Sequence, residues 1–141
     1  MTRDSPVDWP EFFPDGCPRE PYGCRPGRYI RLVSRRESPP DADFTPQISN
    51  RSDIRPKEGP TSVCKRCALS VFNSREAAED FLDNAGGDFR YPYMAWMEVS
   101  DRDGVIHPDE SQHPGHFLWW IPRDDGSRCY REFFRGCVND A

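Results

Sequence analysis

Two hydrophobic patterns meet in residues 68–82, which read ALSVFNSREAAEDFL. The first five residues form a short apolar run that is typical of a buried strand. From Ser74 to about Asn84, apolar side chains recur every three or four residues, which predicts an amphipathic helix. Asn73 is the predicted N-cap of that helix, and Glu76 completes a capping box with it. The stretch therefore predicts a strand that leads directly into a capped helix.

Three other segments have the composition and alternation of strands. They are residues 28–33, 93–99 and 116–121. Residues 101–104 read DRDG, a turn sequence that predicts a hairpin in which Val105 and Ile106 return beside the preceding strand.

The end of the chain has the spacing of a helix. Its apolar residues, spaced i, i+3, i+4, i+7 and i+8, are Tyr130, Phe133, Phe134, Cys137 and Val138. This spacing predicts a C-terminal amphipathic helix. The fold class expected from all these elements is α+β: a small, mainly antiparallel sheet with one capped helix and a C-terminal amphipathic helix.

The chain has 141 residues, enough for one domain with a modest core. Residues 1–27 are rich in Pro and Gly and predict an arm that docks either on its own domain or on a partner. Residues 28–141 form the single α+β domain, in which residues 34–60 are a long surface loop anchored by Asp43 and Phe44. The aromatic residues that pin the arm are Trp9, Phe12 and Phe13.

Charge and hydropathy argue against two classes of partner. A net charge of -5 and a pI near 5.2 do not suit a surface for nucleic-acid phosphates. No apolar run reaches the roughly 18 residues of a membrane span, and the polar start has no signal-peptide core, so we expect a cytoplasmic protein without membrane contact. Arg supplies most of the positive charge, a bias that resembles proteins of GC-rich bacteria.

Six cysteines are present, and without an export signal we expect reduced thiols or metal ligands rather than disulfides. Cys64 and Cys67 have the CxxC spacing of one half of a tetrahedral zinc site. Either Cys17 and Cys24 or the three histidines of the chain could complete that site. The histidines are His107, His113 and His116. The alternative is that the cysteines are reduced and pack as small hydrophobic side chains.

Three polar residues lie on successive predicted strands. Arg31 is on the first strand, Ser70 on the strand before the helix and Glu98 on a later strand. This order, with the strand-to-helix passage over residues 69–81, resembles the Arg, Ser, Glu arrangement of ADP-ribosyltransferase-type and related NAD-cleaving domains. The resemblance implies that Arg31 contacts the NAD phosphate, that the Ser70 strand shapes the nicotinamide pocket, and that Glu98 stabilises the oxocarbenium-like centre or orients the ribose.

The chain departs from that family at two positions. Phe72 replaces the family's second small hydroxyl residue, and Trp96 stands two residues before Glu98, where the family has an acidic residue or Gln. The alternative interpretation is an ordinary strand-helix-strand unit whose Arg31 and Glu98 point outward.

The sequence contains no nucleophile-base pair, phosphate-binding loop or complete metal motif. The favoured function is therefore a non-catalytic intracellular module that binds a protein partner, as an accessory part of a bacterial complex. Its expected contact residues are the aromatic side chains of the arm and of the terminal helix: Trp9, Phe12, Phe13, Phe133 and Phe134. The alternative function is an NAD-cleaving or ADP-ribosyl-transferring enzyme that uses Arg31, Ser70 and Glu98, and a bound zinc is compatible with either function.

Overall fold

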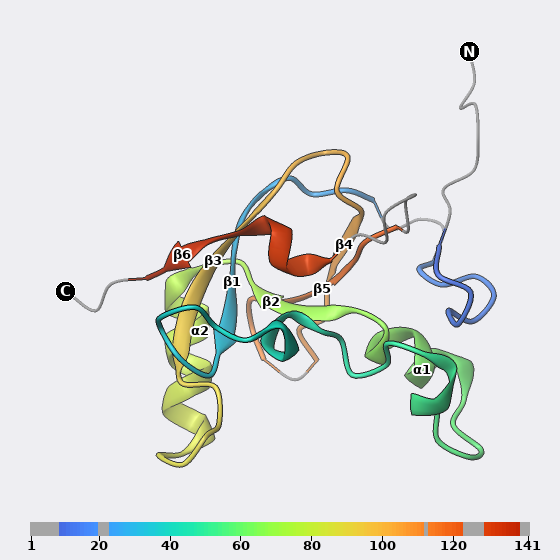
Figure 1. The fold of residues 1–141 in the computed structure, drawn as a ribbon, viewed down its shortest axis with the longest axis horizontal. Coiled ribbons are helices and arrows are strands. Elements are labelled where there is room, and N and C mark those ends of the chain that lie inside the picture. The colour runs from blue at the N-terminus through green and yellow to red at the C-terminus, as the bar shows by residue number, and fades with distance from the viewer. Residues whose placement is uncertain (1–8, 20–22, 112, 123–128, 139–141) are drawn as a thin grey trace.

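The computed structural model describes residues 9–19, 23–111, 113–122 and 129–138. Its centre is a six-stranded antiparallel sheet in the order β4-β5-β2-β1-β3-β6 (Figure 1). The strands are β1 Gly27–Val33, β2 Leu69–Phe72, β3 Tyr93–Val99, β4 Val105–Pro108, β5 His116–Trp120 and β6 Phe134–Cys137. The helices are α1 Pro60–Arg66 and α2 Arg75–Ala85, with 3-10 turns η1 Asp41–Phe44, η2 Arg51–Asp53 and η3 Tyr130–Phe133. The predicted α+β class is confirmed.

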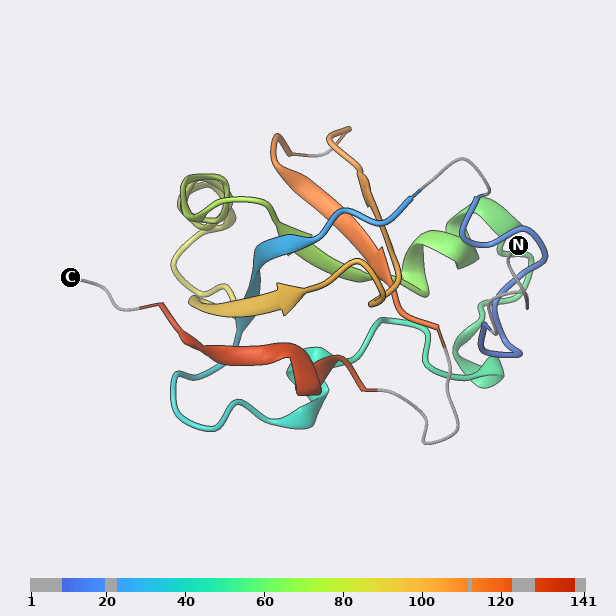
Figure 2. The same cartoon turned by 90° about the horizontal axis from the view of Figure 1, so that it is seen from above.

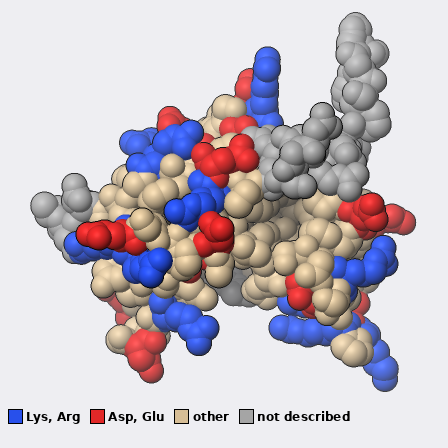
Figure 3. All heavy atoms as spheres, in the orientation of Figure 1, with Lys and Arg blue, Asp and Glu red and all other residues tan. Residues whose placement is uncertain are grey.

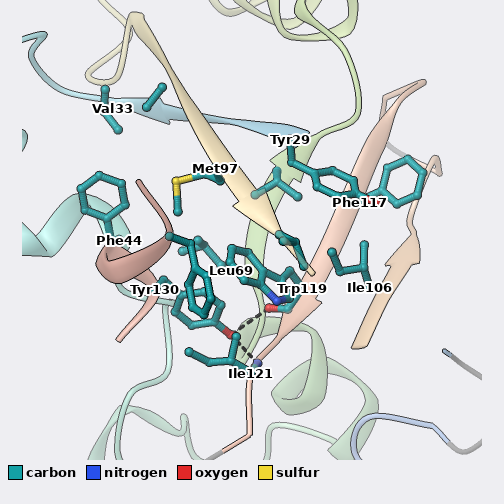
Figure 4. Close-up of a cluster of buried hydrophobic side chains, with 14 residues drawn as sticks. Tyr29, Val33, Phe44, Leu69, Met97, Ile106, Phe117, Trp119, Ile121 and Tyr130 are labelled. Atoms are coloured by element: carbon teal, nitrogen blue, oxygen red, sulfur yellow. Dashed lines mark hydrogen bonds between the residues drawn. The ribbon is translucent and has the colours of Figure 1, made fainter. Parts of the chain in front are cut away.

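One face of the sheet carries a single hydrophobic cluster, which η3 covers (Figure 4). Trp119 lies at its centre, fully buried, with its ring centroid 4.8 Å from that of Tyr130 and 5.0 Å from that of Phe133. The indole N–H of Trp119 donates to the Asp103 carbonyl at 2.8 Å. The Tyr130 hydroxyl donates to the Trp119 carbonyl at 2.8 Å, so the polar atoms of these buried rings are satisfied.

The opposite face carries two separate clusters instead of one. At one end, Leu118 and Trp120 pack against α1 and the N-terminal arm. At the other end, Ile30 and Phe72 pack against α2. Figure 2 shows the two helices at opposite ends of the sheet, with β2 and β5 between them. The middle of this face is therefore not covered by a helix.

The strand-to-helix passage from β2 to α2 is confirmed, but the cap lies one residue later than predicted. The Ser74 hydroxyl, not the Asn73 side chain, accepts a hydrogen bond from the Ala77 amide at 3.1 Å. Asn73 is held in register by its own amide, which donates to the Gly115 carbonyl at 2.9 Å. The helix therefore begins at Arg75, and Glu76 does not complete the predicted capping box.

A pair of alanine substitutions checks this cap. We expect Ser74→Ala to lower the free energy of unfolding by about 1 kcal/mol, because one amide at the start of α2 loses its acceptor. Asn73→Ala is the matched control and should change the free energy by less than about 0.5 kcal/mol. Urea titrations of the two variants give both values. A larger loss for Asn73→Ala than for Ser74→Ala would instead support Asn73 as the N-cap of α2, as the sequence predicted.

The predicted C-terminal helix is wrong. Tyr130–Phe133 makes one 3-10 turn, and the chain then pairs with β3, with Phe134 opposite Met97 and Cys137 opposite Ala95. Gly136 has φ +106°, a conformation that an α-helix does not allow. Phe134 and Cys137 therefore pack on the main cluster from an edge strand with an irregular register, instead of lining a helix.

The predicted hairpin between β3 and β4 is also wrong, because β4 pairs with β5 at the other end of the sheet. The turn itself forms, with the Asp103 carboxylate accepting from the Ser100 amide at 2.7 Å. After it, Gly104 adopts φ +113°, and a Cβ there would lie 2.1 Å from the Trp120 carbonyl oxygen. The chain thus needs glycine where it passes closely over β5 to reach the edge.

The long loop is anchored as predicted by Asp43 and Phe44, which are both buried. Ile48 is a further buried anchor. The helix α1, which ends the loop, was not predicted: Pro60 occupies its first turn, where a missing N–H costs nothing, and Cys64 lies within it. Within the described part of the chain, no helix is long and apolar enough to cross a membrane.

Candidate binding groove

An open groove of about 1070 Å³ crosses the sheet between α1 and α2. Its floor comes from two neighbouring strands, because Ser70 pairs with Leu118 and Phe72 pairs with His116, so all four side chains face the same way. Figure 3 shows the molecule indented between the lobes that carry the two helices. The groove is thus the uncovered middle of the sheet face that α1 and α2 cover at its ends.

Arg31 reaches this groove through an opening between two strands. β1 and β2 are paired only at Ile30 and Phe72, and beyond that point they separate. In the opening, the Arg31 guanidinium donates from Nη1 to the Ser70 carbonyl at 2.9 Å and from Nε to the Asp43 carbonyl at 2.8 Å. These bonds replace the ladder bonds that the separated strands cannot make, and they tie η1 to β2.

The Arg31 charge is only partly compensated by its surroundings. No described carboxylate oxygen lies within 4.0 Å of its guanidinium nitrogens, and the Asp43 carboxylate accepts from the Ser34 amide and hydroxyl at 2.8 Å. Burial lowers the pKa of Arg31 to about 10, and the nearby Asp43 opposes that shift. Arg31 is therefore a charged guanidinium at pH 7 whose acceptors are two carbonyl oxygens.

The two ends of the groove differ in chemistry. At the α1 end, Lys65 lies 3.5 Å from Asp109, and Arg66 makes a bidentate pair with Glu58 at 2.7 and 2.8 Å. Lys65 is not deeply buried, because its side chain is 52% exposed. At the α2 end the lining side chains are aromatic: Phe72, Phe81, Phe89 and Tyr91. The groove thus has ion pairs at one end and aromatic side chains at the other.

The groove brings together two of the three residues singled out by the family resemblance. Arg31 and Ser70 both line it, whereas Glu98 does not. Arg31 is paired with Ala95 in the sheet, so Glu98, three positions further along β3, points to the opposite face from Arg31. Glu98 is 56% exposed and lies 3.6 Å from Arg135.

The predicted zinc site is replaced by a disulfide. Cys64 is bonded to Cys17, with their Cα atoms 5.6 Å apart, so neither sulfur is available as a thiolate ligand. Cys67 is buried in the cluster beside α1, and burial raises the pKa of its thiol to about 12. Cys24 lies elsewhere and donates its thiol to the Ser100 carbonyl at 3.4 Å.

The histidines do not assemble with these cysteines. His113 Nε2 lies 3.2 Å from the Ala77 carbonyl, and His116 Nδ1 lies 3.0 Å from the Asp109 carbonyl. No group of three or more His, Cys, Asp or Glu side chains in the described ranges is arranged to hold a metal ion. The expectation of reduced cysteines or metal ligands is therefore wrong for Cys17 and Cys64.

The aromatic residues predicted to contact a partner pack on the core of this chain. Phe133 is buried, and Phe134 packs half-buried with its ring 5.4 Å from that of Phe44. Trp9, Phe12 and Phe13 pack half-buried on the cluster around Trp120. The physical reason is that pairing of β6 with β3 turns Phe134 inward, and the disulfide holds the arm on the domain.

The sequence pattern did not identify Lys65, Leu118 and the aromatic end of the groove as neighbours. The alternation of β5 places Leu118 on a definite face, but only the pairing of β5 with β2 puts it beside Ser70.

The Ser70 hydroxyl makes no hydrogen bond to a described residue, so no general base is in place to activate it.

No protein-family model matches this chain, and no curated protein or solved structure is similar to it. The groove, with its uncovered sheet face and its incompletely compensated arginine, is the feature that bears most directly on function.

Proposed function

We propose that this chain is a non-catalytic protein-binding module that receives an extended segment of a partner protein in the groove between α1 and α2. The observation that carries the proposal is the uncovered sheet face between the two helices, where Ser70, Leu118 and Phe72 line one continuous groove. A groove that is open along its length accommodates a chain segment better than a small molecule, which usually needs an enclosing pocket.

The composition of the groove supports the same function. Binding energy in protein interfaces is concentrated in aromatic and Arg side chains that can be fully desolvated by a partner. The groove offers both kinds, with Arg31 on the β1 side and Phe81 and Phe89 on the α2 side. In this proposal, the partner binds at the middle of the sheet. The sequence alone suggested the arm and the end of the chain.

A peptide selection tests the proposal. A phage-displayed library of random peptides is selected on the intact, non-reduced protein, and the dissociation constants of synthetic copies are measured by calorimetry. We expect Ser70→Gln to weaken binding by at least about tenfold, because the longer side chain fills the groove floor. Glu98→Gln is the matched control, since Glu98 is exposed and lies outside the groove, and it should leave the affinity within about twofold. Failure to select any peptide, or equal losses in the two variants, would refute the groove as the binding site.

The alternative function is NAD cleavage or ADP-ribosyl transfer by Arg31, Ser70 and Glu98. It is supported by the shared groove of Arg31 and Ser70 and weakened by the position of Glu98, which lies outside that groove. We expect nicotinamide release from NAD to stay at background for the wild type and for Glu98→Gln alike. Release by the wild type that Glu98→Gln abolishes, with folding unchanged, would favour the enzyme over the binding module.

A further inference from the structure

We infer that the groove selects an acidic segment: a carboxylate of the partner pairs with the Arg31 guanidinium, and a neighbouring aromatic or branched apolar residue packs against Phe81 and Phe89. This inference rests on the proposed function and adds the chemistry of the partner to it.

Arg31 has donors left for a ligand. A guanidinium has five N–H groups, and Arg31 uses two of them, on the carbonyl oxygens of Ser70 and Asp43. The remaining three have no acceptor among the described residues. Arg31 Nη2 makes no hydrogen bond to a described residue and is not fully buried, so its N–H groups are within reach of a ligand in the groove. Their planar fork matches the two oxygens of a carboxylate.

The two carbonyl bonds also hold the guanidinium in place. Because Ser70 is on β2 and Asp43 is in η1, the Arg31 side chain is fixed from both sides before a ligand arrives. A charged donor that is half-buried and already oriented loses little entropy when it binds. This gives Arg31 a greater effect on affinity than an exposed lysine would have.

The charges along the groove favour an anion at Arg31 in particular. The charged residues that line the groove include three cations, Arg31, Lys65 and Arg66, and one carboxylate, Asp109. Lys65 is paired with Asp109, and Arg66 is paired with Glu58. Arg31 is the cation of this groove that has no described carboxylate oxygen within 4.0 Å, and the nearby Asp43 compensates its charge only in part. The net charge of the whole chain is -5, so the attraction for an acidic segment is local to the groove and does not come from the overall field.

The aromatic end of the groove favours an aromatic or branched apolar residue next to the partner's acidic residue. The ring of Phe81 lies 5.4 Å from that of Phe72 and 5.5 Å from that of Phe89, and Phe89 lies 5.8 Å from Tyr91. Phe81, Phe89 and Tyr91 are only half-buried, so they keep apolar surface that a ligand can cover. Arg31 and Tyr91 line the same groove, so a residue next to the acidic one in the bound segment can reach the aromatic end.

The peptides selected on the intact protein test this chemistry. We expect them to be enriched in Asp or Glu next to an aromatic or branched apolar residue. In synthetic copies, Asp→Asn or Glu→Gln at the enriched position should weaken binding by at least about tenfold, and this substitution leaves the protein untouched. Amidation of the peptide C-terminus distinguishes the two sources of carboxylate, because it weakens binding only if the terminal group pairs with Arg31.

Variants of the protein complete the test. Arg31→Gln should weaken binding of the acidic peptide by at least about tenfold and should remove its preference over the neutral peptide. Lys65→Gln, at an exposed cation on the same groove, is the matched control and should cost less than about threefold. If Arg31→Gln does not fold, the peptide substitutions decide alone. Peptides that depend on Ser70 but bind equally well when neutral would overturn the inference and leave the proposed function standing, whereas the absence of groove-dependent peptides would refute both.

Discussion

Replacement of Cys17 and Cys64 together by serine lowers the free energy of unfolding by about 4 kcal/mol. The disulfide joins residues separated by 47 positions, and the chain-entropy estimate for a loop of about that length gives this value. It fastens the N-terminal arm to α1, where Phe12 and Phe13 pack on the cluster that contains Trp120. For a domain of this size, the loss is a large part of the total stability.

Urea unfolding with and without a reductant measures this effect. Cys24→Ser is the matched control, because Cys24 is a free cysteine with one weak hydrogen bond, and it should change the stability by less than about 0.5 kcal/mol. Alkylation of the denatured, non-reduced protein should modify four cysteines, Cys24, Cys67, Cys129 and Cys137, and reduction should expose the other two. Six modified cysteines without reductant would show that the disulfide is absent in the purified protein.

Local patterns predicted the elements that depend on neighbouring residues. The strand over 93–99 is reproduced at both ends, and α2 lies within one residue of the predicted helix. Asp43 and Phe44 were identified as loop anchors because they interrupt a polar stretch. In each case the burial pattern along a few residues determines the structure, so no information about distant contacts is needed.

The errors in the fold arise where distant contacts override a local pattern. Residues 130–138 have a helical spacing, but Gly136 interrupts it and the open edge of β3 offers a partner. The turn after β3 has a hairpin sequence, but β4 finds its partner in β5. Cys17 and Cys64 are brought together only by packing of the arm on α1, which no spacing rule contains.

The candidate site was predictable only in part, because the sequence locates its strands but not the way in which they pair. The resemblance identified Arg31 and Ser70, and their strands were located correctly. Their proximity depends on the single point of pairing between β1 and β2, and Glu98 is excluded because it pairs with Arg28, three residues before Arg31 along β1. Strand register is a property of the assembled sheet, so a one-residue difference in it reverses the face of every side chain.

Trp119→Ala has the second large effect, a loss of about 3–5 kcal/mol in the free energy of unfolding. Trp119 is fully buried between Tyr130 and Phe133, so its removal leaves a cavity under η3. It also removes the indole donor to the Asp103 carbonyl, which supports the turn before β4. Trp119→Phe fills part of the cavity without restoring that bond, and an intermediate loss is expected.

Trp96→Ala is the matched control for the Trp119 variant. Trp96 is half-buried on the other face of the sheet, with the Arg28 guanidinium 4.8 Å from its ring, so its removal opens toward solvent and costs less than the loss of Trp119. Thermal and urea unfolding of the three variants give the order Trp119→Ala, Trp119→Phe, Trp96→Ala from the largest loss to the smallest. Because Trp119 faces away from the groove, the folded Trp119→Phe protein should keep its affinity for groove-binding peptides within about twofold. A stability loss for Trp119→Ala no larger than that for Trp96→Ala would contradict a core centred on Trp119.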